Sequence, residues 1–318
     1  MALPYPGMTF TAYDVLHASE LNQMVGNIDY LDNLVEGSMN YYATNRTRIF
    51  IDGTNGNDNN DGLASNRAKK TLSGIANLIN RLGGNVDVRF VSAGTYDITA
   101  GYFDSVNLVF EKNSSSLGTI TINVVSGNVS ILNFNNSYVT FKNMTISSTS
   151  NLNTAFYNSE VDFQDSVVGA FVNLYTSAIV ISGASTLAHR IYARYSSSIS
   201  ISNNCLISLT NALTSGAVLT ASHNSHIFIS NVALTLDDLP SGSSGAILLN
   251  AINSSQVTIH QNASIIDNTV TKYSRGLTSD QSLLFITSSF TNVLNSLGTS
   301  GNSIARSLQV FSGGTIGS

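Results

Sequence analysis

Six hexapeptides that share one pattern lie between residues 136 and 259. They are Asn136-Ser-Tyr-Val-Thr-Phe141, Asn158-Ser-Glu-Val-Asp-Phe163, Thr176-Ser-Ala-Ile-Val-Ile181, Ser196-Ser-Ser-Ile-Ser-Ile201, Asn224-Ser-His-Ile-Phe-Ile229 and Ser254-Ser-Gln-Val-Thr-Ile259. Each has a small polar residue, then serine, then any residue, then Val or Ile, then any residue, and then Phe or Ile. Apolar residues two apart predict a strand with one buried face. The polar residue and serine before the strand predict a turn, because short polar side chains hydrogen-bond their own backbone.

The hexapeptides recur at the intervals of a solenoid. Their first apolar residues are separated by 22, 18, 20, 28 and 30 residues. From the second copy to the last, a further short strand is expected before the turn, at residues 154–157, 170–175, 190–195, 217–221 and 246–252. One such coil cannot bury its own apolar face, so coils must stack. We therefore predict an all-β fold, a right-handed parallel β-helix, with a weaker seventh copy at Ser289-Phe-Thr-Asn-Val293.

An antiparallel β-sandwich is the alternative fold, since it also contains many short strands. Two features favour the β-helix. The serine holds the same place in all six copies, as stacked turns require, and the hairpin signals Asn-Gly and Asp-Gly are missing between the strands.

Composition limits the classes of partner. The 318 residues carry a net charge of −5, only 10% of them are charged, and no basic patch stands out. We therefore expect no nucleic acid partner. No stretch approaches the ~18 apolar residues of a membrane helix, so no membrane insertion is expected. The first residues also lack the basic start and apolar run of a signal peptide.

The sequence gives little indication of a metal site or of a reactive thiol. The single Cys205 excludes an internal disulfide framework and is expected to be a small core residue. His189, His223, His226 and His260 are scattered singly on expected strands, and we predict them at the surface. We predict no cofactor.

The N-terminal region predicts an extended arm and a helix. Leu21, Met24, Ile28, Leu31 and Val35 are spaced three and four residues apart, which is the spacing of two heptads. Two interpretations stay open, a seam that joins copies of the chain and an amphipathic helix packed on its own domain.

A second segment is expected to close the first coil. It contains a strand at 48–52, a polar loop, a helix at 68–82 with one apolar face, a strand at 86–91 and a turn at 94–96. A closing element is physically needed, because the first coil otherwise exposes a sheet edge and the end of an apolar core.

This second segment resembles the entry to the pectate-lyase-like β-helices of bacteriophage tail fibres and tailspikes. The resemblance rests on Asp52-Gly53, Gly56, Asp58, Asp61-Gly62, Lys70-Thr71 and Gly94-Thr95-Tyr96. Residues 8–22 also resemble the N-terminal modules of phage fibre proteins, which usually attach the fibre to the virion. The resemblance implies that the 68–82 helix caps the solenoid.

The resemblance also implies an organisation and a location. Residues 1–40 are a virion-attachment arm and helix, 41–85 the entry strand and capping helix, and 86–318 the shaft. The expected location is the virion, in a tail or other surface appendage, and the expected partners are other virion proteins, further copies in a homotrimer, and a host surface glycan or protein. A structural fibre is the first hypothesis; a glycan depolymerase of the tailspike type and a cell-surface adhesin are the others.

A calcium loop is a further candidate in the polar segment. Asn57-x-Asn59-x-Asp61-Gly62 has the spacing of such a loop, but Ala68 stands where the bidentate glutamate belongs. The alternative is a turn built from residues that tolerate left-handed backbone.

The depolymerase hypothesis needs paired carboxylates. Glu160 and Asp162 lie two apart on one expected strand and share its outer face, and Asp165 follows in the turn. These three are weak catalytic candidates, and a solvated outer edge is the alternative that we favour. The chain has no tryptophan to form a sugar platform.

Tyrosines precede three of the turns. Tyr157, Tyr175 and Tyr195 hold the same place in successive copies. They predict a structural stack of rings, with a sugar-binding platform as the alternative.

The longer coils predict loops on one side of the shaft. The additional residues lie in 208–216, 235–245 and 267–282. Insertions that map to one face of a solenoid often form its binding face. The host-contact candidates on these loops are Asp237, Asp238, Lys272, Tyr273, Arg275 and Asp280. The alternative is that these loops cover a flank or pack against a neighbouring subunit.

Overall fold

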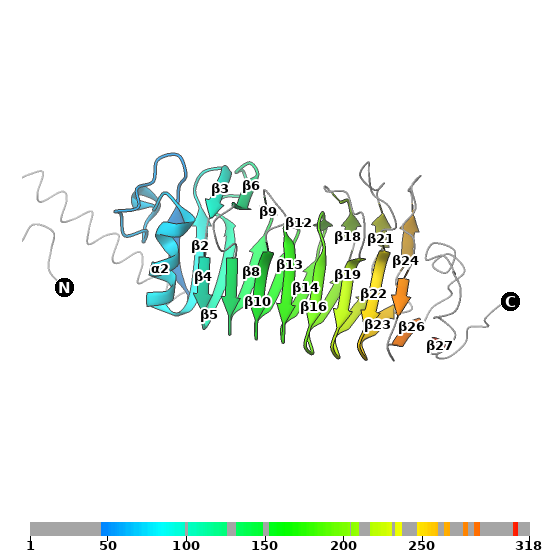
Figure 1. Ribbon diagram of the computed structural model, residues 1–318. Helices are drawn as coiled ribbons and strands as arrows, with labels where there is room; N and C mark the ends of the chain where they lie inside the picture. The colour runs from blue at the N-terminus through cyan, green and yellow to red at the C-terminus, as the bar shows by residue number, and fades with distance from the viewer. Residues whose placement is uncertain are drawn as a thin grey trace, which may run out of the picture.

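Three parallel sheets form the fold in the computed structural model (Figure 1). The structure describes residues 46–98, 101–125, 132–148, 153–203, 205–209, 217–230, 233–236, 247–259, 264–267, 276–278, 283–286 and 308–310. Every strand pair within these ranges is parallel. The β-helix is therefore confirmed, because a sandwich would contain antiparallel neighbours.

The longest sheet, sheet A, contains the six repeated hexapeptide strands. Its eleven strands, in spatial order, are β1 (Thr47–Ile51), β2 (Gly84–Phe90), β5 (Val106–Lys112), β8 (Tyr138–Lys142), β11 (Glu160–Gln164), β14 (Ala178–Ser182), β17 (Ser198–Ser202), β20 (His226–Ser230), β23 (Gln256–Ile259), β26 (Leu283–Ile286) and β27 (Leu308–Val310). The spatial order follows the order along the chain, so each coil adds one strand.

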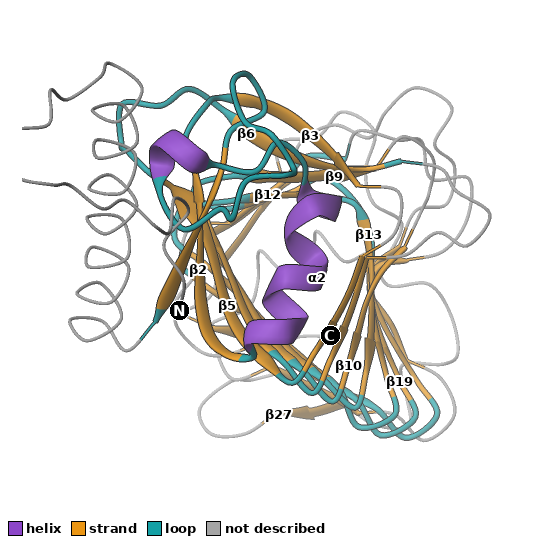
Figure 2. Cartoon of the chain, turned by 90° about the vertical axis from the view of Figure 1, so that its left-hand side faces the viewer, coloured by secondary structure: helices purple, strands orange, loops and turns teal. Residues whose placement is uncertain are grey.

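Sheets B and C have eight strands each. Sheet B contains β3 (Gly94–Ile98), β6 (Ile120–Val124), β9 (Thr145–Ser148), β12 (Val167–Gly169), β15 (Thr186–Leu187), β18 (Cys205–Ile207), β21 (Ala233–Leu236) and β24 (Ser264–Asp267). Sheet C contains β4 (Gly101–Asp104), β7 (Leu132–Asn135), β10 (Asn153–Tyr157), β13 (Phe171–Tyr175), β16 (Ile191–Arg194), β19 (Ala217–Ser222), β22 (Ile247–Ile252) and β25 (Gly276–Thr278). Each full coil passes from sheet C to sheet A and then to sheet B. Figure 2, viewed along the stack, shows the three sheets around one interior.

The apolar residues of the hexapeptides stack inside the solenoid, as predicted. Val139 pairs with Val161, which pairs in turn with Ile179, and all three are fully buried. In the first coils the interior is aromatic: Phe110, Phe141 and Phe163 of sheet A stack with ring centroids 5.1 Å apart. Later coils place isoleucine at the same position, so the core becomes aliphatic toward the C-terminus.

One correction concerns the seventh copy. The strand that follows β23 in sheet A is β26, in which Leu284 and Ile286 pair with Val257 and Ile259. The seventh copy is therefore Ser282-Leu-Leu-Phe-Ile286, with leucine where the other copies have Val or Ile. The predicted copy at 289–293 lies outside the described residues.

Helix α2 (Leu72–Leu82) closes the first coil. Leu72, Ile75 and Ile79 are buried, and the helix contacts β1, β3 and β4, one strand from each sheet. Figure 2 shows α2 across the space that the sheets enclose. The capping role is confirmed: α2 removes the apolar end of the core from water.

The helix begins four residues later than predicted. A 3₁₀ turn, η1 (Ser65–Arg67), precedes it, and Lys69 forms a parallel bridge with Ile51 of β1. Thr71 is the N-cap and its hydroxyl accepts a hydrogen bond from Gly74 N at 2.9 Å. Residues 68–70 are thus extended, because pairing with the entry strand outweighs their helical pattern.

Candidate functional site

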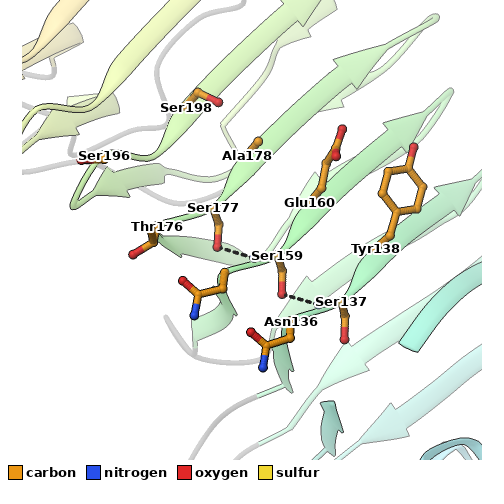
Figure 3. Close-up of a pocket in the computed structure, with 11 residues that line it drawn as sticks. Asn136, Ser137, Tyr138, Ser159, Glu160, Thr176, Ser177, Ala178, Ser196 and Ser198 are labelled. Atoms are coloured by element: carbon orange, nitrogen blue, oxygen red, sulfur yellow. Dashed lines mark hydrogen bonds between the residues drawn. The ribbon is translucent and has the colours of Figure 1, made fainter. Parts of the chain in front are cut away.

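A shallow groove follows the turn between sheet C and sheet A. Its volume is about 500 Å³, and it crosses four successive coils. Figure 3 shows its lining side chains. One wall is formed by turn residues, the other by the first residues of strands, and the floor by serines; the lining residues are Asn136, Ser137, Tyr138, Asn158, Ser159, Glu160, Thr176, Ser177, Ala178, Ser196 and Ser198.

The floor of the groove is a continuous chain of serine hydrogen bonds. Ser137 N donates to Ser159 Oγ, Ser159 N donates to Ser177 Oγ, and the pattern continues through Ser197, Ser225 and Ser255 at 3.0–3.1 Å. The hydroxyl of Ser159 in turn donates to Tyr157 O at 2.8 Å. The repeated serine therefore satisfies buried backbone groups, and it fixes the turns relative to one another.

This arrangement predicts a loss of stability when one serine is removed. Replacing Ser177 with alanine leaves the buried Ser159 N–H without its acceptor, and we expect the free energy of unfolding to fall by about 1–3 kcal/mol. Urea denaturation followed by circular dichroism measures this change. Ser198→Ala is the control, because its hydroxyl has no hydrogen bond among the described residues. Equal stability of the two variants would contradict the role of Ser177.

The residue before each serine has left-handed backbone. Asn136, Asn158 and Thr176 have φ of 47°, 46° and 53°. Asparagine tolerates this conformation better than most residues, which explains its frequency at the position. Such a turn directs the side chains of successive coils outward in one row, the outer wall of the groove (Figure 3).

A second chain of serines lies at the turn between sheets A and B. Met144 N donates to Ser166 Oγ at 3.4 Å, and Ser166 N donates to Ser185 Oγ at 3.1 Å. Sequence analysis missed this turn, although a signal exists. The left-handed residues that mark it, at 143, 165, 183 and 203, recur at 22, 18 and 20 residues, the same steps as the hexapeptides.

The three candidate carboxylates lie in different surroundings. Glu160 is exposed, with Asp162 two residues later on the outer face of β11, as predicted. Asp162 accepts hydrogen bonds from Gln164 and Ser182, at 2.5 and 3.3 Å. Asp165 is a left-handed turn residue whose carboxylate accepts from Ala184 N at 2.8 Å. Asp162 and Asp165 thus contribute to the solenoid itself, and Glu160 alone of the three lines the groove.

The predicted tyrosine stack forms, with rings from three successive coils. Tyr157 and Tyr175 pair in register, and their rings are nearly parallel with centroids 4.7 Å apart. Burial raises the pKa of Tyr157, with Tyr175 adding to the effect. The Tyr195 ring continues the stack, with its centroid 6.2 Å from that of Tyr175. Its backbone is shifted by one residue, because Arg194 pairs with Tyr175 and Tyr195 lies in the turn with φ of 54°. That coil has two left-handed residues where the earlier coils have one, which shifts the backbone of the third tyrosine while its ring stays in the stack.

The polar segment before α2 is a structural connection. Asp58 accepts hydrogen bonds from Lys70 N and Thr71 N at 2.9 Å each, and from the hydroxyl of Thr71 at 2.8 Å. Burial raises the pKa of Asp58, but these bonds outweigh it and hold the pKa below its usual value. A Cβ on Gly74 would overlap the Asp58 carboxylate, so glycine is required there.

The same segment uses its oxygen atoms for internal bonds. Side-chain oxygens of Asn57 and Asp61 accept backbone N–H groups at 3.0 Å, as in the predicted turn. The Lys69 ammonium group donates to the carbonyl oxygens of Asp58 and Asn60 at 2.7 and 2.6 Å. A lysine cation therefore occupies the centre of the loop, and we favour the turn over a calcium site.

One histidine prediction needs correction. His189 is only 4% exposed and lies beside Phe171, where burial lowers its pKa to about 4 with help from Arg190. His226 lies on the outer face of β20, as predicted, but it is half-buried there and burial lowers its pKa. The burial of His189 follows from the register of the coils, which an isolated histidine in a sequence does not reveal. Cys205 lies in the core, as predicted, where burial raises its pKa to about 12.

Acid is expected to destabilise the solenoid through His189. An unfolded histidine has a pKa of 6.5, so between pH 6.5 and 4 the unfolded chain binds a proton that the folded chain rejects, and stability falls as the pH falls. At pH 5 the loss amounts to about 2 kcal/mol. His189→Gln should lessen the decrease in thermal stability between pH 7.5 and 5, whereas His223→Asn should not. An unchanged decrease in His189→Gln would contradict this assignment.

The remaining predicted site residues all lie outside the described residues. These are the N-terminal Leu21, Met24, Ile28, Leu31 and Val35, and the host-contact candidates Asp237, Asp238, Lys272, Tyr273, Arg275 and Asp280. The connections that contain the candidates are nevertheless defined by their flanking strands. In the sequence, residues 208–216, 237–246 and 268–275 each follow a strand of sheet B and precede the next strand of sheet C. Asp280 instead lies in the sequence between β25 of sheet C and β26 of sheet A.

Within the described ranges, no three His, Cys, Asp or Glu side chains are grouped as metal ligands would be. None of the helices described there has the length and apolar character needed to cross a membrane. Comparisons of the chain with family models, with curated proteins and with solved structures found no match.

Proposed function

We propose that this chain is a structural fibre protein of a bacteriophage virion. Residues 1–40 attach it to other virion proteins, and the β-helix is a stiff spacer that carries its distal coils toward the host surface. The fibre is a homotrimer, for which the heptad spacing between residues 21 and 35 provides a seam.

The observation that best supports the proposal is the order in which the chain builds its coils. Sheet A begins with β1 and ends with β27, and its spatial order is the order of the sequence. Ten strand spacings of ~4.8 Å separate β1 from β27 by about 48 Å. A partner bound before β1 is therefore held at a fixed distance from the distal coils, which is the property that a spacer requires.

The entry segment gives independent support. The residues on which its resemblance to phage β-helices rests have defined roles here: Asp58 binds the start of α2, and the Tyr96 hydroxyl accepts from Gly53 N at 3.2 Å and donates to Ser92 O at 2.7 Å. The enzymatic alternative gains no comparable support, because Asp162 and Asp165 are hydrogen-bonded within the solenoid.

Removal of residues 1–40 tests the attachment. Because β1 begins at Thr47, we expect the truncated chain to keep the circular dichroism spectrum of the β-helix but to disappear from purified particles. Mass spectrometry of particles that carry the full-length or truncated chain measures incorporation. Equal incorporation of both would refute an N-terminal anchor, and absence of the full-length chain from particles would refute the fibre.

A further inference from the structure

We infer that the groove along the turn between sheets C and A binds a neutral oligosaccharide, with the Tyr138 ring as its platform. This inference rests on the proposed function in one respect, since it names the class of host molecule that the fibre contacts.

The groove has the form of a site for an extended ligand. It crosses the coils from Asn136 to Ser196, three spacings of ~4.8 Å, and is thus about 14 Å long. Its floor is the hydrogen-bonded chain of serines, so the walls are held in fixed positions. A preformed, rigid groove binds without a large loss of conformational entropy.

Its walls offer polar groups that the solenoid does not use. The side chains of Asn158, Glu160 and Thr176 have no hydrogen-bond partner in the described part of the chain, and all three line the groove. They present an amide and a hydroxyl on the turn wall and a carboxylate on the strand wall. Neighbouring sugar hydroxyl groups pair with such a set of donors and acceptors.

Tyr138 provides the apolar contact. Its side chain is 40% exposed at the start of β8, and it is the groove's aromatic residue. Tyr157 and Tyr175, in contrast, stack on each other on the sheet C side of the turn. An exposed ring with a polar hydroxyl suits the C–H face and the hydroxyl groups of a pyranose.

The charge and the hydrogen bonding of the groove argue against acidic glycans, phosphates and extended peptides as ligands. The lining residues include Glu160 and no cation, so an acidic glycan or a phosphate would be repelled. An extended peptide binds by adding a strand to a free sheet edge, but this groove runs across strands and its floor N–H groups are already bonded. A neutral sugar chain is the class that remains.

Binding of the full-length chain to a glycan array tests the inference. The array carries neutral hexose and N-acetylhexosamine oligosaccharides together with uronic-acid-containing ones. We expect binding to neutral members of at least tetrasaccharide length, weakened about tenfold or more by Tyr138→Ala, as for an aromatic anchor. Glu160→Gln should also weaken it, without making acidic sugars the preferred ligands. Tyr102→Ala is the matched control, because Tyr102 is 54% exposed on β4 and should leave binding unchanged.

Each result has a definite meaning. Binding to no member, binding only to acidic members, or full binding by Tyr138→Ala would overturn the inference, provided that circular dichroism shows the variants folded. The fibre proposal is judged separately by the presence of the chain in particles. A chain that binds sugar but is absent from particles would refute the fibre and leave the groove assignment intact.

Discussion

Replacement of Ile201 with aspartate should unfold the middle of the shaft. Ile201 is fully buried in β17 and lies between Ile181 and Ile229 of the adjacent coils. The variant places a carboxylate in an apolar interior with no cation beside it, which costs several kcal/mol. Since each coil is stabilised mainly by its neighbours, we expect the coils around β17 to lose their structure together.

The control for this variant lies one residue away. Ser200 points outward from the same strand, between Val180 and Phe228, and Ser200→Asp should change stability by no more than about 0.5 kcal/mol. Limited proteolysis followed by mass spectrometry locates the unfolded coils, and urea denaturation measures the loss. Similar stability of the two variants would show that residue 201 does not face the interior.

Truncation of Phe141 should give the second large effect. Its ring is fully buried and stacks between Phe110 and Phe163, with a further edge contact to Phe134 at 6.1 Å. Phe141→Ala removes this ring and leaves a cavity that neighbouring coils cannot fill by collapse, so we expect a loss of about 3–5 kcal/mol.

Phe228→Ala is the matched control for Phe141. Phe228 lies in the same sheet, but its side chain is on the outer face of β20. Its truncation should cost clearly less in urea denaturation, since the ring is only partly withdrawn from water in the folded chain. A larger loss for Phe228 than for Phe141 would contradict the aromatic core.

The repeated hexapeptides and their spacing in the sequence were enough to predict the β-helical shaft. A parallel β-helix needs the same residue type at the same point of every coil, and Ser177 and Ile179 meet this requirement in a form that the sequence displays directly. The serine recurs because the backbone N–H of the preceding coil needs an acceptor at that point. The helix that closes the first coil was predictable from a different pattern. Its apolar face, which includes Ile75 and Ile79, has to be buried, and the open end of the core is the surface available for it.

Other features depend on contacts that no local pattern shows. The late start of α2 is set by Asp58, twelve or more residues earlier in the chain, and by the bridge from Lys69 to Ile51. The position of Tyr195 depends on one additional left-handed residue in its turn. His189 is buried because of how the corner between sheets B and C packs, a property of the stack rather than of its neighbours in the sequence.

Local sequence patterns could not predict the groove either. Tyr138, Glu160 and Ala178 are separated by 22 and 18 residues in the sequence, and they form one wall only because the register of β8, β11 and β14 aligns them. Glu160 was considered for its proximity to Asp162, whereas the structure associates it with residues of adjacent coils. The register of the stack is therefore the claim on which both the spacer and the groove depend.

An engineered disulfide tests that register directly. Ala178 pairs with Ser198, so their Cα atoms should be ~4.8 Å apart, within the range of about 4.4–6.8 Å that a disulfide spans. The native Cys205 should not interfere, because burial raises the pKa of its thiol to about 12. Mild oxidation of the dilute Ala178→Cys/Ser198→Cys variant should give an intramolecular bond, detected by peptide mass spectrometry. Ala178→Cys/Ser200→Cys, two residues out of register, should give none. Absence of the first bond, or equal formation of both, would contradict the stacked parallel coils.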